Sequence, residues 1–539
     1  MSEKRWWKEA VVYQVYPRSF MDSDGDGVGD LNGITARLDH LSDLGVDVVW
    51  LSPHFDSPNA DNGYDIRDYR KVMSDFGDMA DFDRMLSEMK ARGLRLIIDL
   101  VVNHTSDQHA WFQESRRGAD NPYNDFYIWR DGKHGGPPNN WVSIFGGPAW
   151  TFDETRGQYY LHLFTPQQPD LNWDNPAVRT QVHDLMRFWL DKGVSGFRMD
   201  VIAFISKPPG LPDLTAEQLV HPERAYACGP RLHDYLQAMN REVLSRYDVM
   251  TVGEAFGVSP DQARLLTDER RGELDMVIDF SLVDLQRVGG PDDWALPQFK
   301  AVLDRLDHST GEHGWNSAFL GNHDQPRPVS RFGDDHSDWR MASAKTLATV
   351  LLTQRATPFI YQGEEIAMAN APFAGIEAFD DVWAKNFWRD QVLAGRMSPA
   401  AALNRLRCMG RDNARTPMQW SAATGAGFSR GRPWLAVNPD AGWVNAAAQA
   451  DDEDSVLAHY RRLIALRKAH PALVYGAYQD LDPDHPAMFA YSRTLDGETW
   501  LVLANFGRET LDYRLPSGAD IAAEVFRLEG WASLVQRIR

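Results

Sequence analysis

Three acidic residues each stand at the end of a short apolar run, and this placement could support the hydrolysis of a glycosidic bond. They are Asp200, Glu254 and Asp324. A carboxylate just past a buried strand is held rigidly while its oxygens still reach a cleft. Glycoside hydrolysis uses two such groups, one as nucleophile and one as general acid. A single aspartate at a strand end is more often a loop cap, but three at matching strand ends favour catalysis.

Arg198 lies two residues before Asp200, so both side chains point to the same face of a strand. A guanidinium beside a carboxylate lowers the carboxyl pKa and keeps the group ionised, as a nucleophile must be. We therefore predict an ionised Asp200. Glu254, shielded in a pocket, is predicted to stay protonated as the acid. His104 and His323 belong to the same predicted constellation.

Short apolar runs alternate with longer helical patterns, which is typical of a parallel sheet covered by helices. Helices are predicted over residues 34–44, 81–92, 178–192 and 455–468. Strands are predicted over 11–16, 46–51, 94–101, 194–199, 249–252, 276–279, 318–320 and 358–361. Eight strand–helix units predict an α/β fold, a closed (β/α)8 TIM barrel whose strand ends meet on one face. An open doubly wound sheet is the alternative.

Two segments depart from the barrel pattern. From about residue 105 to 173 the chain is rich in Gly, Pro, Asn, Trp and Tyr, and a structureless loop of that length is uncommon inside a compact domain. We predict a small inserted domain over 105–173, after the third strand. Short alternating strands after the last helix predict a C-terminal antiparallel β domain over 471–539. Residues 1–104 and 174–470 form the predicted barrel.

Composition narrows the class of partner. The formal net charge of −20 over 539 residues argues against nucleic acid or an anionic membrane, whereas a small uncharged oligosaccharide is indifferent to it. The sequence holds no run of eighteen apolar residues and no signal-peptide pattern. With two cysteines in all, these features predict a cytoplasmic protein. We expect either a monomer or a homodimer, a choice that these features do not decide.

Four segments resemble, in order, the four signature regions of the α-amylase family, glycoside hydrolase family 13. They are residues 99–104, 196–200, 253–254 and 322–324, and residues 168–172 resemble a fifth region. The resemblance covers essentially the whole chain. It implies Asp200 as nucleophile, Glu254 as acid/base and Asp324 as stabiliser of the transition state. It also implies retention of the α-anomer through a covalent glucosyl-enzyme, without an organic cofactor.

Within the family, residues 57–65 and 410–420 resemble the α-glucosidase branch. The resemblance implies that Asp61 and Arg411 bind the outer hydroxyls of the terminal glucose and that Tyr64 stacks on its ring. Such an ion pair would exclude longer chains and leave exo-action on short oligosaccharides. An ion pair of Arg411 with a loop carboxylate is the alternative. The other residues of the implied pocket wall are His104, Phe145, Phe164, Gln168, Arg198 and His323.

Val201 follows the predicted nucleophile. In this branch Val at that place resembles enzymes that prefer α-1,6 bonds, whereas Thr accompanies α-1,4 preference. One hydroxyl contributes only about 1–3 kcal/mol of discrimination, so mixed specificity is expected. We predict a retaining exo-acting α-glucosidase of the oligo-1,6-glucosidase type, with α-1,4 or sucrose activity and transglucosylation in addition.

Other segments resemble sucrose isomerases, which make isomaltulose or trehalulose. They are residues 471–481, residues 206–210 and the pair Phe256 and Phe280. Those enzymes hold a freed fructose with an aromatic clamp and an arginine-containing loop. Here residues 284–287 begin with Asp284 where the isomerase pattern has arginine, so isomerisation is the alternative to hydrolysis. A non-catalytic sugar-binding relative is a further alternative, although such relatives lose acidic residues and all three are present here.

The acidic loop over residues 22–30 places oxygens at alternate positions, as in a calcium loop, but Gly33 stands where an EF-hand has its twelfth ligand. The family has a comparable metal loop after its first strand. The resemblance therefore implies a structural Ca²⁺, with Mg²⁺ as the alternative ion and a solvated turn as the alternative structure. The implied ligands are Asp22, Asp24, Asp26, the Val28 carbonyl and Asp30.

Overall fold

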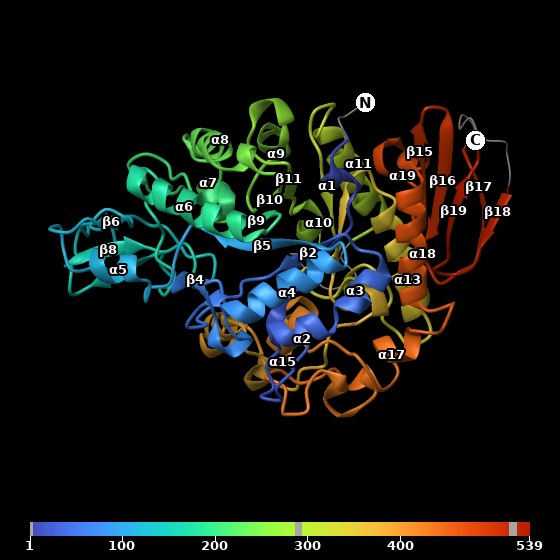
Figure 1. The fold of residues 1–539 in the computed structure, drawn as a ribbon, viewed down its shortest axis with the longest axis horizontal. Helices are drawn as coiled ribbons and strands as arrows, with labels where there is room; N and C mark the ends of the chain where they lie inside the picture. The colour runs from blue at the N-terminus through green and yellow to red at the C-terminus, as the bar shows by residue number, and fades with distance from the viewer. Residues whose placement is uncertain (1–3, 286–293, 517–524) are drawn as a thin grey trace.

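An eight-stranded parallel sheet surrounded by helices forms the centre of the computed structural model, which describes residues 4–285, 294–516 and 525–539 (Figure 1). Its strand order is β11-β10-β9-β5-β2-β1-β13-β12. The bounds are β1 Val12–Val15, β2 Val48–Leu51, β5 Arg95–Val101, β9 Gly196–Asp200, β10 Met250–Glu254, β11 Met276–Ile278, β12 Ser317–Ala318 and β13 Thr357–Tyr361. The Ser317 hydroxyl donates to the Val277 carbonyl at 2.7 Å and so links the two end strands. The predicted TIM barrel is confirmed.

Each barrel strand overlaps its predicted apolar run. Strands β1, β2, β9, β10 and β13 are buried along their whole length, which explains why their sequences are nearly continuously apolar. β12 is shorter than predicted and pairs with β13 only through Ser317 and Ala318. Pro358, opposite Ala318, has no amide hydrogen to continue the ladder.

Three predicted helices agree with the structure to within two residues, and one does not. α4 Met79–Ala91, α6 Pro176–Lys192 and α18 Val456–Ala469 match. The single helix predicted over 34–44 is wrong, because the chain forms α2 Leu31–Ala36 and α3 Leu38–Leu44. Arg37 between them leaves the helical conformation, and its guanidinium lies 4.4 Å from the centre of the Trp420 ring. Tertiary packing thus overrides a helical pattern that continues through the break.

After β5 the chain forms a separate three-stranded antiparallel sheet in the order β6-β8-β7, with the short helix α5 Ala110–Ser115. The strands are β6 Trp129–Arg130, β7 Trp150–Asp153 and β8 Gln158–Leu161. Asp170 ties this segment to the barrel through a β-bridge with His104 and a 2.7 Å ion pair with Lys207 in the loop after β9. We propose that this segment is an inserted domain over residues 105–173.

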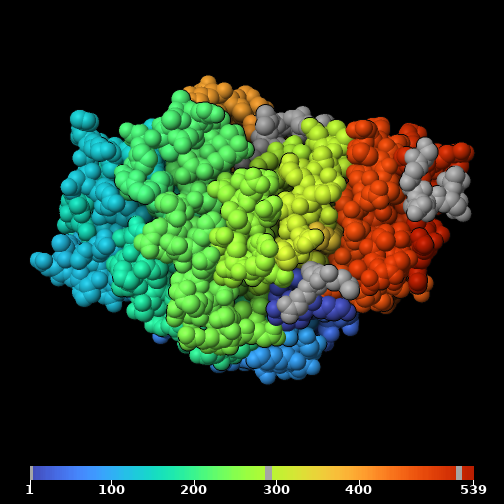
Figure 2. Space-filling model, turned by 90° about the horizontal axis from the view of Figure 1, so that it is seen from above, coloured from blue at the N-terminus to red at the C-terminus, as the bar shows by residue number. Residues whose placement is uncertain are grey.

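The C-terminal part is an antiparallel β domain, at the opposite end of the molecule from the inserted segment (Figures 1 and 2). Its main sheet has the order β14-β15-β16-β19, with β17 Leu511–Arg514 and β18 Val525–Leu528 paired beside it. The main strands are β14 Ala477–Asp480, β15 Met488–Leu495, β16 Glu498–Asn505 and β19 Ser533–Arg537. Buried Arg493 donates to the carbonyls of Thr353 and Leu473 and so fastens this sheet to the barrel end. Among the described residues, no helix is both long and apolar enough to cross a lipid bilayer.

Gly196 opens the strand that carries Arg198 and Asp200, with φ of +145°, and an added Cβ would lie 1.9 Å from the Met250 carbonyl oxygen. We expect Gly196→Ala to destabilise the fold by ~3 kcal/mol or more, because backbone strain and a clash with a neighbouring strand add. Gly93→Ala is the matched control, since Gly93 has φ of +74° with nothing within 4 Å. That variant should lose only about 1 kcal/mol. Thermal unfolding of both variants checks this, and equal losses would contradict it.

Candidate active site

The barrel brings the predicted carboxylates to one face. Asp200 ends β9, Glu254 ends β10, and Asp324 lies in the loop after β12. Arg198 joins the first two, because its Nη1 lies 2.7 Å from Asp200 Oδ1 and its Nη2 lies 2.9 Å from Glu254 Oε2. Asp200 and Glu254 are 6% and 7% exposed, so both carboxylates sit in a nearly water-free environment.

Arg198 also binds a third carboxylate that the sequence analysis did not select. Its Nη1 lies 2.7 Å from Asp99 Oδ1, and the Trp50 indole donates to the other oxygen of Asp99 at 2.7 Å. Asp99 stands in the segment 99–104 that resembled a signature region, so its position was a usable signal. One buried guanidinium therefore holds three carboxylates in a fixed arrangement.

Burial raises the pKa of Asp200 to about 7 and the pKa of Glu254 to about 7. Arg198 lowers both values but does not outweigh burial. The charge of Asp99 raises the pKa of Asp200 further, and the charge of Asp200 raises that of Glu254. The prediction that Arg198 gives Asp200 a lowered pKa is therefore wrong, because desolvation is the larger effect. Two interacting carboxyl groups of this kind share one proton near neutral pH, which is the state that an acid and a nucleophile need together.

The backbone of Val201, next to Asp200 and Glu254, is strained. Its φ of +32° and ψ of +41° fall in the left-handed region, which β-branched residues rarely adopt. In this conformation its N–H donates to Glu254 Oε2 at 2.9 Å, the same oxygen that Arg198 contacts. With Oε2 accepting from two N–H donors, the proton of a neutral Glu254 resides on Oε1.

Asp324 differs from the other two carboxylates. Burial raises its pKa, but the attraction of the Arg411 and Arg415 guanidinium groups outweighs burial and places the pKa well below its usual range. Arg415 Nη2 lies 2.6 Å from Asp324 Oδ1, and Arg411 Nη1 lies 3.3 Å from the same oxygen. Asp324 therefore stays ionised. Arg415 was not predicted, since only proximity in the fold links it to Asp324.

The predicted ion pair at the end of the pocket is present. Arg411 Nη2 lies 3.1 Å from Asp61 Oδ1, and Gln168 donates to the other oxygen of Asp61 at 3.1 Å. The guanidinium also lies 4.8 Å from the centre of the Phe145 ring. The alternative expectation is met as well, because Arg411 pairs with the loop carboxylate of Asp381. Arg411 thus has both interactions at once.

The two histidines are neutral parts of the pocket wall. Burial lowers the pKa of His104 to about 4 and the pKa of His323 to about 3. His323 Nε2 lies 2.6 Å from the Tyr64 hydroxyl, and the two rings are stacked 5.2 Å apart. His104 contacts Gln168 at 3.3 Å, and its ring lies 5.2 Å from Phe164.

A cavity of about 400 Å³ opens outward from Asp324 and Arg411. Phe256 lines it, with Phe280 packed behind at 5.0 Å between ring centres. Sequence reasoning missed most of this mouth, because its residues come from loops and short helices that carry no motif. The lining residues that were not predicted are Ser143, Ile144, Pro222, Glu223, Val283, Gln325, Trp383, Arg405 and Met409.

Residues 14–476 match the family profile described as the catalytic domain of α-amylase. The chain belongs to the α-amylase family. It is a glycoside hydrolase of this family and is similar to curated members over its full length. It shares 51% identity with the oligo-1,6-glucosidase of Parageobacillus thermoglucosidasius, covering 100% of both chains. It shares 52% with that of Halalkalibacterium halodurans, covering 95% of this chain and 92% of the relative.

Among solved structures, this α-amylase family member is similar to a variant of isomaltulose synthase from Erwinia rhapontici in complex with its natural substrate sucrose. The TM-score is 0.97 and the identity 52%, with 100% of both chains covered. The family includes hydrolases and isomerases at nearly the same identity to this chain, so identity alone does not separate the two reactions.

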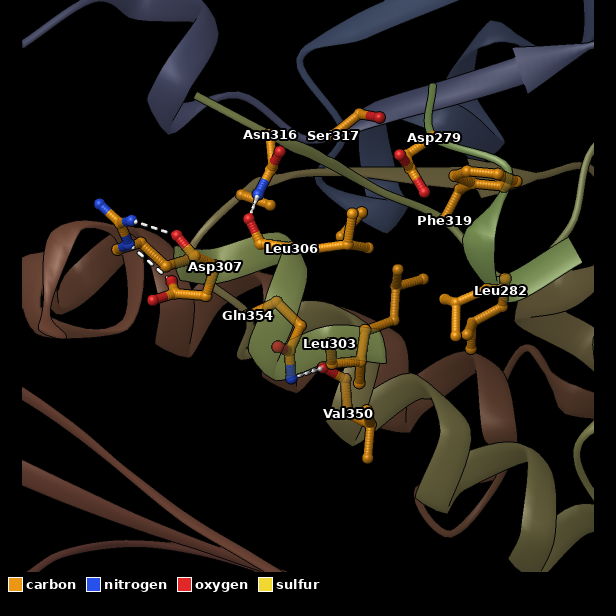
Figure 3. Close-up of a pocket in the computed structure, with 15 residues that line it drawn as sticks. Asp279, Leu282, Leu303, Leu306, Asp307, Asn316, Ser317, Phe319, Val350 and Gln354 are labelled. Atoms are coloured by element: carbon orange, nitrogen blue, oxygen red, sulfur yellow. Dashed lines mark hydrogen bonds and ion pairs between the residues drawn. The ribbon is translucent and has the colours of Figure 1, made fainter. Parts of the chain in front are cut away.

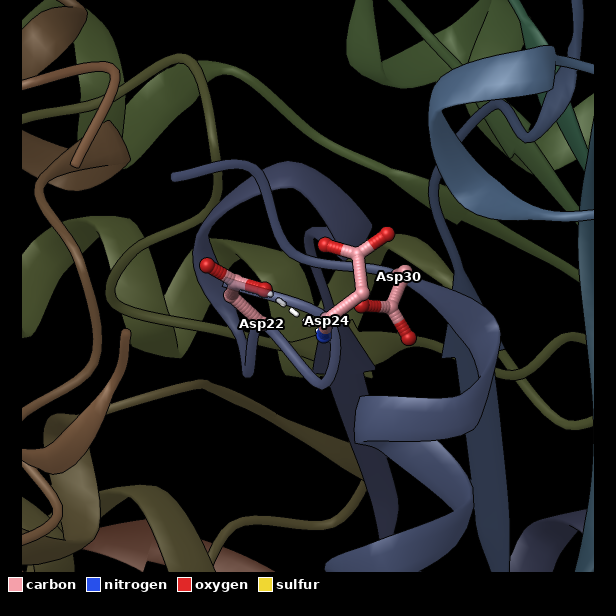
Figure 4. A group of neighbouring side chains, drawn as sticks. All are labelled: Asp22, Asp24 and Asp30. Atoms are coloured by element: carbon pink, nitrogen blue, oxygen red, sulfur yellow. Dashed lines mark hydrogen bonds between the residues drawn. The ribbon is translucent and has the colours of Figure 1, made fainter. Parts of the chain in front are cut away.

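The acidic loop of this family member brings three of the five predicted metal ligands together. Carboxylate oxygens of Asp22, Asp24 and Asp30 lie within 4.8 Å of one another (Figure 4). Asp26 lies outside this group, and its carboxylate accepts from the Val28 N–H at 2.7 Å. Three converging carboxylates suit a hard divalent cation. Burial raises the pKa of Asp22, but hydrogen bonds from Ser429 and from backbone N–H groups outweigh it and lower the pKa, as a ligand requires.

A second cavity, of about 30 Å³, lies behind the barrel wall at the β11–β12 seam (Figure 3). Leu282, Leu303 and Val350 line it, and an Asp307–Arg355 ion pair of 2.7 Å closes one side. This volume holds about one water molecule. We interpret it as a packing gap where β11 and β12 lack backbone pairing, since its lining includes none of the predicted catalytic carboxylates.

The shared proton predicts the pH dependence of turnover. A raised pKa means that the Asp200–Glu254 pair keeps its proton up to about pH 7 and loses it above. We expect kcat/KM on isomaltose to fall about tenfold per pH unit above that value, because the acid is lost. In Glu254→Gln, release of p-nitrophenol from its α-glucoside, which needs no acid, should lack this alkaline limb. A limb that persists in that variant would contradict the assignment.

Proposed function

We propose that this protein is a retaining exo-acting α-glucosidase that cleaves terminal non-reducing α-glucosidic bonds of short oligosaccharides. The α-1,6 bond of isomaltose is the main target, with α-1,4 or sucrose activity and transglucosylation in addition. The ion pair of Asp61 and Arg411 carries the proposal. Its Oδ1 and Nη2 atoms lie 3.1 Å apart at the end of the pocket, and Arg411 also contacts Asp324. A pocket closed by charged groups accepts one terminal glucose and excludes a continuing chain.

We assign the chemical steps to three carboxylates. Asp200 attacks the anomeric carbon with Oδ2, since Arg198 occupies Oδ1. Glu254 donates its Oε1 proton to the leaving glycosidic oxygen as that bond breaks. Water then attacks the glucosyl ester, Glu254 takes the proton from the water, and Asp200 leaves as carboxylate. Asp324, ionised throughout, stabilises the positive charge of the transition state.

A substrate panel tests this proposal. Isomaltose, maltose and sucrose are incubated with the enzyme and the products are separated by chromatography. Glucose as the main product, with the α-anomer released first, supports the retaining hydrolase. Asp200→Ala should lose at least about 10³-fold in kcat, because no other group can form the glucosyl ester. Full turnover by that variant would refute the mechanism.

Sucrose isomerisation is the second candidate function. It is supported by the similarity to isomaltulose synthase, at TM-score 0.97, and by the Phe256–Phe280 pair at the mouth. Asp284 at the first position of the isomerase loop weighs against it, and Gln286 and Arg287 of that loop lie outside the described residues. Isomaltulose or trehalulose as the main product from sucrose would replace hydrolysis with this function. A non-catalytic binding role is disfavoured, because all three carboxylates and Arg198 are in place.

Val201 predicts how linkage preference can be changed. Thr has the same branched shape, so Val201→Thr should keep the left-handed backbone while it adds a hydroxyl toward the incoming sugar. We expect the ratio of kcat/KM for isomaltose over maltose to fall by roughly tenfold. Val201→Ala is the control, since it removes volume without adding a hydroxyl. An equal fall in that variant would show that volume alone sets the preference.

We propose that Asp22, Asp24 and Asp30 hold a structural Ca²⁺, with Mg²⁺ as the alternative, and that the protein is a cytoplasmic monomer or homodimer. The convergence of three carboxylates supports the ion site. A bound ion would neutralise the repulsion among the three carboxylates and thereby stabilise the loop after β1.

The presence of only two cysteines in 539 residues supports a reducing compartment.

Chelation tests the ion site. An ion present at 100 times its Kd stabilises the folded state by about 2.7 kcal/mol. We therefore expect EDTA to lower the Tm by a few degrees, and added Ca²⁺ to restore it. Asp22→Asn should abolish the effect of EDTA. Asp26→Asn is the matched control and should keep it, because Asp26 lies outside the cluster. Equal Tm values with and without EDTA in the unmodified protein would contradict an ion site.

A further inference from the structure

Asp381 is a buried carboxylate that no motif in the sequence singled out. It directly precedes α14 Val382–Trp388 and is 0% exposed. Its Oδ1 accepts from Arg411 Nε at 3.0 Å and from Arg411 Nη2 at 2.5 Å, and it lies 3.6 Å from Arg415 Nη1. A buried charge must be paired, and these two arginines are its cationic partners among the described residues.

Arg411 contacts three carboxylates. Its Nε edge faces Asp381, while Nη2 also reaches Asp61 at 3.1 Å and Nη1 reaches Asp324 at 3.3 Å. A guanidinium is planar, with its N–H donors in a rigid fork. Once Asp381 holds the Nε edge, the directions of the remaining donors are determined. Without that anchor, the side chain could turn and bind Asp61 or Asp324 with both donors.

Arg415 extends the same argument to Asp324. Its Nη2 donates to Asp324 at 2.6 Å and its Nε donates to the His323 carbonyl at 3.1 Å. Two arginines therefore face three carboxylates, Asp61, Asp324 and Asp381, and the buried carboxyl of Asp412 adds a fourth acidic group beside Asp381 and Arg415. If Asp381 lost its charge, both arginines would be free to bind Asp61 and Asp324 more closely. Those oxygens would then be less available to the hydroxyls of a bound glucose.

We propose that Asp381 is a positioning residue that holds Arg411 and Arg415 away from full pairing with Asp61 and Asp324, so that these carboxylates can bind the terminal glucose. This inference rests on the proposed function, because it assumes that Asp61 and Asp324 contact that sugar. It adds a residue that acts through the arginines and does not itself touch the substrate.

Asp381 also has a structural role, which the test must separate. Its carboxylate accepts from the Trp383 and Ala384 N–H groups at 3.3 Å each and so caps α14. Loss of a cap lowers stability by about 1 kcal/mol without any effect on charge in the pocket. Ser398 provides a matched control, because its hydroxyl caps the nearby helix α15 Pro399–Met409 through Ala401 N–H at 3.3 Å.

The experiment compares Asp381→Ala, Asp381→Asn and Ser398→Ala by kinetics on isomaltose and by thermal unfolding. We expect Asp381→Ala to raise KM at least tenfold and to lower kcat by a smaller factor. Formate should restore KM several-fold by entering the vacated site, whereas formamide, of similar size but uncharged, should not. Asp381→Asn keeps a capping oxygen and should raise KM severalfold with little change in Tm. Ser398→Ala should lower Tm and leave KM unchanged.

Other outcomes would overturn the inference. An unchanged KM in both Asp381 variants, or rescue by formamide equal to rescue by formate, would show that Asp381 acts only as the N-cap of α14. If Asp381→Ala fails to fold, the KM of Asp381→Asn decides alone. The failure of the proposed function is distinguishable, since it would appear as inactivity of the unmodified enzyme on isomaltose, maltose and sucrose. An unmodified enzyme that isomerises sucrose still allows the same comparison with sucrose as substrate.

Discussion

The arrangement of the whole site depends on one buried guanidinium shared by three carboxylates. Arg198 contacts Asp99, Asp200 and Glu254, and each of the three comes from a different strand of the barrel. Any one of these charges would be costly to bury alone, whereas together they hold one another in register. This cluster depends on the parallel sheet, because neighbouring parallel strands bring three carboxylates within reach of one side chain.

The same network affects the pKa values of Asp200 and Glu254. Both side chains are buried, so desolvation raises the pKa of Asp200 and that of Glu254 together. The strained N–H of Val201 and the Arg198 guanidinium occupy one oxygen of Glu254 and leave the other to carry the proton. A backbone distortion in a β-branched residue is costly and persists only where its surroundings enforce it. Here it aims the Val201 N–H at the Glu254 carboxylate.

A second charged network, built from loops, closes the pocket. Arg411 and Arg415 approach from the long segment after β13, Asp61 from the segment between β2 and β5, and Asp324 from the loop after β12. The charge balance differs from that around Arg198. Here two guanidinium groups act on Asp324 and lower its pKa, whereas a single guanidinium faces three carboxylates at Arg198. The two networks therefore differ in charge state, since burial raises the pKa of the carboxyls around Arg198 whereas Asp324 stays ionised.

The sequence by itself determined the eight strands and the position of a carboxylate at the end of β9 and of β10, because apolar runs and their polar ends are local features. Its motifs also identified Arg198, Asp61 and Arg411 as candidate site residues. Only the tertiary structure decided the direction of the Asp200 pKa, since burial is a property of everything packed around the group. The break at Arg37 and the roles of Asp99, Arg415 and Asp381 likewise depend on partners distant in the chain. Contacts of that kind leave no periodicity or spacing in a sequence, so they become visible only when the loops meet.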